Sequence, residues 1–184
     1  MKIGSIVEDL KLERRVAITP EIAKKLVNDG FEINLQKNYA KHLGFEDRDY
    51  EALNVKILEN EKLVFKNSEI LAQLNLPSKS KLENLDSNKL LIGMLNSYQN
   101  KKELDELVKN KINCFSLELL PRITRAQSMD VLSSQANLAG YKAVVESFGS
   151  FEKAIPMMMT EAGTIPAAKV LVVVVGVEGL KAIA

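Results

Sequence analysis

The sequence has a single cysteine and no apolar run long enough to cross a membrane. Cys114 lies in an apolar segment and has no partner for a disulfide within the chain, which favours a small core residue in a reducing compartment. A membrane helix needs about 20 apolar residues, whereas residues 170–175 have only the length of a strand. The start, MKIGSIVEDL, lacks the apolar core of a signal peptide. We therefore expect a soluble chain of the cytoplasmic type.

An excess of charge of one sign is also absent, and His42 is the only histidine. The chain has 25 Lys+Arg against 24 Asp+Glu, a net charge of +1. This balance gives no electrostatic footprint for nucleic acid or for a membrane surface. His42 lies in the polar segment KNYAKHLGF, where we expect a surface residue. With 184 residues, the chain is long enough for an ordinary domain with a core.

Short apolar runs alternate with helical patterns along most of the chain. Strands are predicted at residues 2–6, 31–35, 55–58, 70–74, 90–95 and 112–116. Helices are predicted at residues 46–53 and 101–108, from 130 to about 148, and from Thr19 and Pro20, as cap and first residue, to Gly30. This repeated alternation predicts an α/β fold with a doubly wound, mostly parallel sheet of flavodoxin or Rossmann type.

The order of these patterns predicts three segments. Residues 1–130 form the N-terminal α/β domain, and residues 131–166 form a connecting helix and a crossover with Pro156, Gly163 and Pro166. Residues 167–184 contain one strand, 169–175, and a helix that begins near Gly176. Because a nucleotide-binding domain needs several strand–helix–strand units, we expect this last segment to be the truncated start of a second Rossmann domain.

A polar loop follows the predicted strand at residues 112–116. It contains Arg122, Arg125 and Gln127, and then Asp130 and Ser133 at the start of a helical pattern. In an open α/β sheet, ligands bind at the carboxyl ends of the strands. Guanidinium, amide, carboxylate and hydroxyl groups together can satisfy a carboxamide and its ribose. The alternative is that Asp130 only caps the helix while both arginines solvate a surface turn.

Three ordered segments carry a resemblance to a known family. They are ERRVAITPEIAKKLVNDGFEI, PRITRAQSMDVLSSQANLAGYKAV and PMMMTEAGTIPAAKVLVVVVGVEGLKAIA. Together they resemble the alpha subunit of the proton-translocating NAD(P) transhydrogenases, within the alanine dehydrogenase/transhydrogenase superfamily. The middle segment is similar to the family's nicotinamide-binding loop, and the last to the entry into its NAD-binding domain. The resemblance covers essentially the whole chain.

The resemblance implies a Re/Si-specific transhydrogenase subunit that binds NAD(H) and passes hydride to NADP(H) on a partner subunit. Arg122, Gln127, Asp130 and Ser133 would position the nicotinamide end, with Gln127 nearest the partner's cofactor, while Arg125 would be structural. No side-chain acid or base is needed, since the cofactors carry the chemistry. The implied partners are a second copy of the chain in a homodimer, an NADP-binding beta subunit and membrane-spanning domains. These domains would translocate protons and hold the cytoplasmic chain at the inner membrane.

The turn near Gly176 departs from the family's dinucleotide-binding fingerprint. The three glycine positions of that motif fall on Val174, Gly176 and Gly179. Val174 replaces the glycine of the tight turn by a β-branched residue, and Glu178 places a carboxylate where phosphate would bind. Gly176 and Gly179 remain the implied cofactor-binding residues of this segment.

Two alternatives follow from such departures. In the alanine dehydrogenases, an arginine matching Arg15 holds the substrate, and the family's lysine and histidine positions fall on Gln73 and Asn96. Neither amide can shuttle a proton, which opposes amino-acid deamination. The second alternative is a non-catalytic interaction or dimerisation module that has lost NAD binding, as Val174 and Glu178 suggest. We expect the truncated chain to be inactive alone and to bind NADH very weakly.

Overall fold

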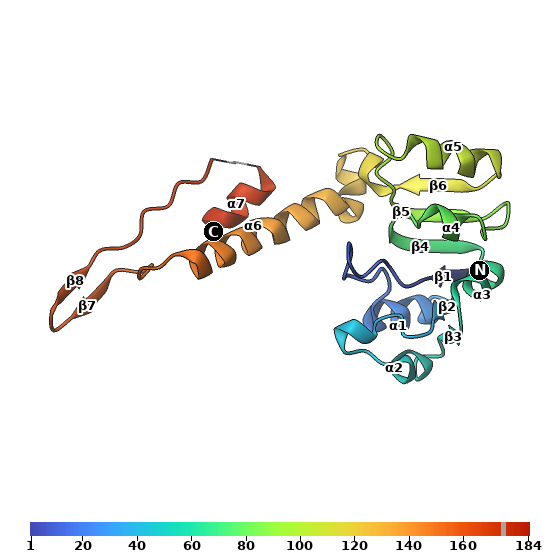
Figure 1. Ribbon diagram of the computed structural model, residues 1–184, viewed down its shortest axis with the longest axis horizontal. Helices are drawn as coiled ribbons and strands as arrows, with labels where there is room; N and C mark the ends of the chain where they lie inside the picture. The colour runs from blue at the N-terminus through green and yellow to red at the C-terminus, as the bar shows by residue number, and fades with distance from the viewer. Residues whose placement is uncertain (174–175) are drawn as a thin grey trace. The chain divides into compact units, whose positions relative to one another are not determined.

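The computed structural model describes residues 1–173 and 176–184, which form two compact units, Met1–Leu120 and Pro121–Ala184 (Figure 1). The first unit contains the strands β1 (Lys2–Ser5), β2 (Glu32–Gln36), β3 (Lys56–Leu58), β4 (Ile70–Asn75), β5 (Leu90–Met94) and β6 (Asn113–Ser116). Its helices are α1 (Pro20–Asn28), α2 (Asp47–Glu51), α3 (Glu61–Asn67), α4 (Lys79–Leu82) and α5 (Lys101–Lys109), with the 3₁₀ turns η1 (Lys41–Leu43) and η2 (Leu117–Leu119).

The six strands form one parallel sheet in the order β3-β2-β1-β4-β5-β6. This is the strand order of a doubly wound Rossmann sheet, and it reverses direction between β1 and β4. All six predicted strands of this unit are present, each within two residues of its predicted ends. The predicted fold class is therefore confirmed.

The core covers both faces of this sheet. Successive side chains of a strand point to opposite faces. In β4, Ile70 and Ala72 pack against a cluster that contains Ile33 and Leu35, whereas Leu71 belongs to another cluster with Phe65. A sheet that is buried on both faces requires helices on both sides, which is what a doubly wound arrangement supplies.

Local signals explain where the first helix begins and ends. The Thr19 hydroxyl accepts a hydrogen bond from the backbone of Ile22, and Pro20 is the first helical residue of α1. Asp29 caps the other end, and Gly30 follows with a left-handed φ of 88° that a glycine adopts without strain. The sequence prediction for this helix is confirmed.

The second unit contains the turn η3 (Thr124–Met129), the helices α6 (Val131–Ser150) and α7 (Val177–Ile183), and a hairpin of β7 (Met158–Thr160) with β8 (Gly163–Ile165). α6 and α7 pack against each other. None of the described residues belongs to a helix that is both long and apolar enough to span a bilayer.

The structure differs from the sequence prediction at several elements. The predicted strand at residues 169–175 is wrong for residues 169–173, which pair with no strand within the described chain; residues 174 and 175 lie outside the described residues. A strand forms only where its backbone groups find a partner, and an apolar sequence does not provide one. The short helices α3 and α4 and the β7–β8 hairpin were not predicted.

Candidate functional site

The first unit has a polar cavity where its strand order reverses. The cavity has a volume of about 550 Å³ and lies at the carboxyl ends of β1 and β4. Its polar lining consists of Glu8, Asp9, Glu13, Gln73, Asn75, Ser78, Lys81, Asn96 and Asn100. Ligands of open α/β sheets bind at such a switch point. We call this cavity the switch-point cavity.

Gln73 occupies the centre of this region and is only 4% exposed. Its amide oxygen accepts hydrogen bonds from the Ile6 backbone N–H at 2.7 Å and from the Ser5 hydroxyl at 2.9 Å. Its amide nitrogen donates to the Ile6 carbonyl at 3.3 Å and to a Glu8 oxygen at 3.1 Å. The side chain therefore makes four internal hydrogen bonds, and its amide holds β1 and β4 together.

Glu8 is half-buried beside Gln73. Its carboxylate accepts the Leu74 backbone N–H at 2.7 Å, at a place where the pairing of β4 with β5 shifts register. Burial raises the pKa of Glu8 above its ordinary value, although the hydrogen bond from Leu74 acts in the opposite direction. A bulge of this kind releases a backbone group from the sheet, and here Glu8 satisfies that group.

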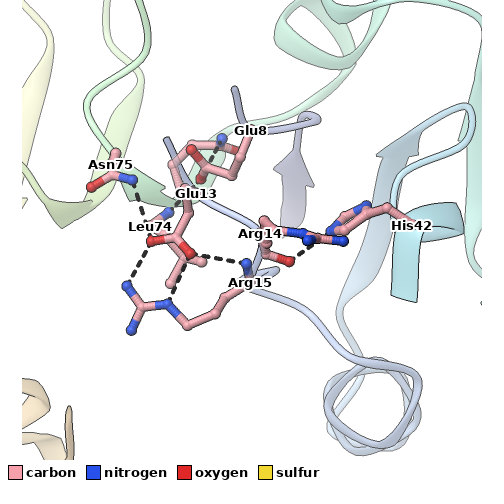
Figure 2. Close-up of polar contacts among 8 residues, drawn as sticks. Glu8, Glu13, Arg14, Arg15, His42, Leu74 and Asn75 are labelled. Carbon is pink, nitrogen blue, oxygen red and sulfur yellow. Dashed lines mark hydrogen bonds and ion pairs between the residues drawn. The ribbon is translucent and has the colours of Figure 1, made fainter. Parts of the chain in front are cut away.

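Glu13 and Arg15 form a two-point ion pair beside the cavity (Figure 2). Arg15 Nη2 lies 2.6 Å from Glu13 Oε2, and Arg15 Nε donates to Glu13 Oε1 at 2.9 Å. Asn75 also contacts this carboxylate, at 3.5 Å. The hydrogen bond from Arg15 lowers the pKa of Glu13 to about 2. Arg15 is thus held in a fixed, charge-neutral pair.

His42 is not the free surface residue that its polar segment predicts. Its side chain is half-buried, and Nε2 lies 2.6 Å from the Arg14 carbonyl oxygen (Figure 2). The segment before α1 folds back over η1, so a polar sequence is partly covered by a neighbouring stretch of chain. Cys114, predicted as a small core residue, is half-buried against the core, and burial raises the pKa of its thiol.

The switch-point cavity places Gln73 and Asn96 together, as their predicted equivalence to a catalytic pair requires. Neither side chain titrates, so they offer no proton transfer. Asn75, Lys81 and Asn100 also line the cavity, and the sequence analysis did not single them out. Their position directly after β4 and β5, at the carboxyl edge of the sheet, is the signal that points to them.

The second unit brings the predicted loop residues together. Arg122, Gln127 and Asp130 line a cavity of about 230 Å³ around η3, with Ile123, Thr124 and Ala126. Arg125 is exposed and is not part of that lining. We call this cavity the loop cavity. Its lining contains a guanidinium, an amide and a carboxylate, which is the donor and acceptor set that was predicted.

Asp130 also caps α6, as the alternative interpretation of the loop predicted. Its two carboxylate oxygens accept the Ser133 backbone N–H at 2.9 Å and the Ser133 hydroxyl at 2.6 Å. The Ser133 hydroxyl and backbone hydrogen bonds lower the pKa of Asp130, and the Arg122 guanidinium adds to this. Capping and a place in the loop cavity are therefore compatible, because one carboxylate does both.

Gly176 and Gly179 lie apart from this loop in the sequence and line other surfaces. Gly176 precedes the first turn of α7, and Gly179 is buried on that helix. Gly179 lines a larger, mostly apolar cavity of about 610 Å³ bounded by α6, α7 and residues 168–173. Neither glycine lines the loop cavity. Val174 lies outside the described residues.

A Rossmann-like parallel sheet with a polar switch point defines the first unit as an α/β domain of the nucleotide-enzyme type. Residues 5–139 match the family described as alanine dehydrogenase/PNT, N-terminal domain. The chain belongs to this family, and the predicted resemblance is confirmed.

Curated relatives extend the match over the whole chain. The first of the separate parts of NAD(P) transhydrogenase subunit alpha from Rickettsia prowazekii is 40% identical over all of this chain and 49% of its own length. The protein of the same name from Rhodospirillum rubrum is 39% identical over the same shares. The chain thus spans about half the length of these relatives.

Solved structures agree with this assignment. The crystal structure of transhydrogenase from Sinorhizobium meliloti superposes with a TM-score of 0.93 at 37% identity, over all of this chain and 55% of the other. An L-alanine dehydrogenase superposes with a TM-score of 0.81 at 20% identity, over all of this chain and 51% of the other. The second likeness shows a shared fold.

Proposed function

We propose that this chain belongs to a transhydrogenase, binds NAD(H) and orients it for direct hydride transfer to NADP(H) on a partner subunit. The observation that carries the proposal is the convergence of Arg122, Gln127 and Asp130 on one cavity, in a chain whose relatives are transhydrogenase subunits. Gly176 and Gly179 would contact the cofactor elsewhere.

The groups of the loop cavity fit a nicotinamide and its ribose. The Arg122 guanidinium and the Gln127 amide nitrogen donate hydrogen bonds, and the Gln127 oxygen accepts them, as a carboxamide requires. Asp130 and Ser133 already bond to each other and keep lone pairs for ribose hydroxyls. The bound cofactor supplies the hydride chemistry, and the protein contributes orientation.

The switch-point cavity supports the same proposal by opposing deamination. Gln73 uses its amide in four internal hydrogen bonds, and Arg15 is paired with Glu13. Deamination needs a side chain that moves a proton at the reacting carbon, and an amide cannot do so. Hydride transfer between two nicotinamides has no such requirement, because the hydride passes between carbon atoms and leaves no proton to be moved.

The wider assembly belongs to this proposal as well. We propose that the chain forms a homodimer, works with an NADP-binding beta subunit, and is held at the cytoplasmic side of the inner membrane by membrane-spanning partners that translocate protons. The relatives are named as subunits and parts of subunits, which supports partner chains.

A non-catalytic interaction module is the second candidate. Leu138, Tyr141, Val145 and Phe148 are exposed on α6 at helical spacing. An exposed apolar stripe of this kind favours contact with another protein surface. This candidate requires no cofactor at the loop cavity, and so a binding measurement separates the two candidates.

The proposal is tested by an NMR titration of the ¹⁵N-labelled chain with NADH. We expect saturable shifts of the backbone signals of residues 127–133. Arg122→Ala should weaken binding about tenfold, because a charged multi-donor contact is lost. Arg125→Ala is the matched control and should change the affinity less than about twofold, because its side chain lies outside the loop cavity. Equal effects of both variants, or no saturable shifts, would reject the NAD(H) assignment.

A further inference from the structure

α6 and α7 cross at a contact where both helices lack a side chain. Gly140 is the buried residue of α6, and Gly179 is the buried residue of α7. The two helices pack closely within the second unit. Two buried glycines at one crossing allow the helix backbones to approach more closely than side chains would permit.

The space next to Gly140 is filled by backbone atoms of α7. A Cβ atom built on Gly140 would lie 2.9 Å from the Glu178 carbonyl carbon and 3.2 Å from its Cα, and it would collide with the Glu178 carbonyl oxygen. Backbone atoms in a helix cannot rotate away as the end of a side chain can. Any residue other than glycine at this position therefore displaces α7 from α6.

We propose that Gly140 is a positioning residue for the NAD(H) site. It seats the first turn of α7, with Gly176 and Gly179, at a fixed place along α6. Gly140 follows the Asp130 cap by ten residues, which is about 15 Å of helix. This inference rests on the proposed function, in which the loop cavity and the α7 glycines contact different parts of one cofactor.

A purely stabilising glycine would behave differently. Glycine inside a helix is less favourable than alanine, so a helical glycine without close neighbours gains stability when it becomes alanine. Gly149 lies on α6, and a Cβ atom there would meet nothing within 4 Å. Gly149→Ala is therefore a matched control on the same helix, with the same chemical change and without the contact.

The test compares Gly140→Ala and Gly149→Ala in the full 184-residue chain by NMR, with NADH as the probe. Nuclear Overhauser contacts between residue 140 and Glu178 or Gly179 report the helix crossing, and the titration reports the affinity of the folded molecules. We expect Gly140→Ala to lose these contacts and to bind NADH at least about tenfold more weakly. Gly149→Ala should keep the contacts and the affinity.

The second variant, Gly179→Ala, tests the crossing from the other helix if Gly140→Ala folds poorly. It should also displace α7 and weaken NADH binding. The positioning role is overturned if the folded Gly140 or Gly179 variant binds NADH within twofold of the wild type, even when its melting temperature falls. If the wild-type chain itself shows no saturable shifts, the proposed function is rejected and the positioning role with it.

Discussion

One buried amide decides what the switch-point cavity can do chemically. Gln73 stands where the alanine dehydrogenases carry a lysine by resemblance, and all of its hydrogen bonds go to β1, Ile6 and Glu8. A neutral side chain that is fully bonded inside the protein has no role for a proton. At the scale of single residues, this cavity is built for structure, and the polar groups of the second unit remain for the cofactor.

The Glu13–Arg15 pair predicts how stability depends on pH. Arg15 lowers the pKa of Glu13 from an ordinary 4.5 to about 2 in the folded chain. Glu13 therefore stabilises the fold fully above pH 4.5, and this contribution is lost as the pH falls toward 2. Glu13→Gln should lower the free energy of unfolding by about 1 kcal/mol at neutral pH, since the Arg15 side chain is half-exposed. The variant should also lose part of the acid dependence.

Urea unfolding from neutral pH to about pH 2 measures this effect. Glu59→Gln is the control, because Glu59 forms an exposed pair with Lys37 and its loss should change stability by less than about 0.5 kcal/mol. If wild type and Glu13→Gln show parallel pH profiles, the ion pair does not act as described.

At the scale of elements, the start of α6 joins stability and binding in one carboxylate. Asp130→Ala should destabilise the chain by about 1 kcal/mol, because the helix loses its cap. Asp130→Asn should leave stability nearly unchanged, since asparagine caps equally well. It should still weaken NADH binding, because the charge is lost from the loop cavity. Thermal unfolding and NADH titration of both variants separate the two roles.

Ser134→Ala is the matched control for this cap. Its hydroxyl donates to the Val131 carbonyl within the same first turn, but it bonds no backbone N–H among the described residues. We expect little change in stability or in NADH affinity. Loss of stability in Asp130→Asn as large as in Asp130→Ala would contradict the capping assignment, and unchanged NADH affinity in Asp130→Asn would remove its carboxylate from the site.

The elements that the sequence predicted well are those with two agreeing signals. α1 has a capping threonine, a proline at its first position and a glycine after its end, and the structure follows all three. α3 and α4 are short, with little apolar periodicity to distinguish them from loops. Residues 169–173 show the opposite failure, because apolar character predicts a strand while pairing depends on distant chain.

At the scale of the whole molecule, the sequence predicted the sheet and the polar loop but not how the polar groups pair. Strand–helix alternation predicts a parallel sheet, and the loop after residues 112–116 predicts a cluster at its carboxyl edge. The four hydrogen bonds of Gln73 depend on β1 and β4 lying side by side, although they are far apart in sequence. Gly140 meets the first turn of α7 for the same reason, and no local pattern predicts that contact.

The central claim is that the loop cavity orients a dinucleotide for hydride transfer. The most direct measurement places residues 122–133 into the Rhodospirillum rubrum relative and follows hydride transfer by stopped flow, with and without Gln127→Asn. Shortening the side chain moves its amide by about 1.5 Å, and displacements near this size cost about a hundredfold in rate. We predict a loss of that order in transfer rate and less than about a threefold change in NADH affinity. A variant that transfers hydride at the wild-type rate would contradict the claim.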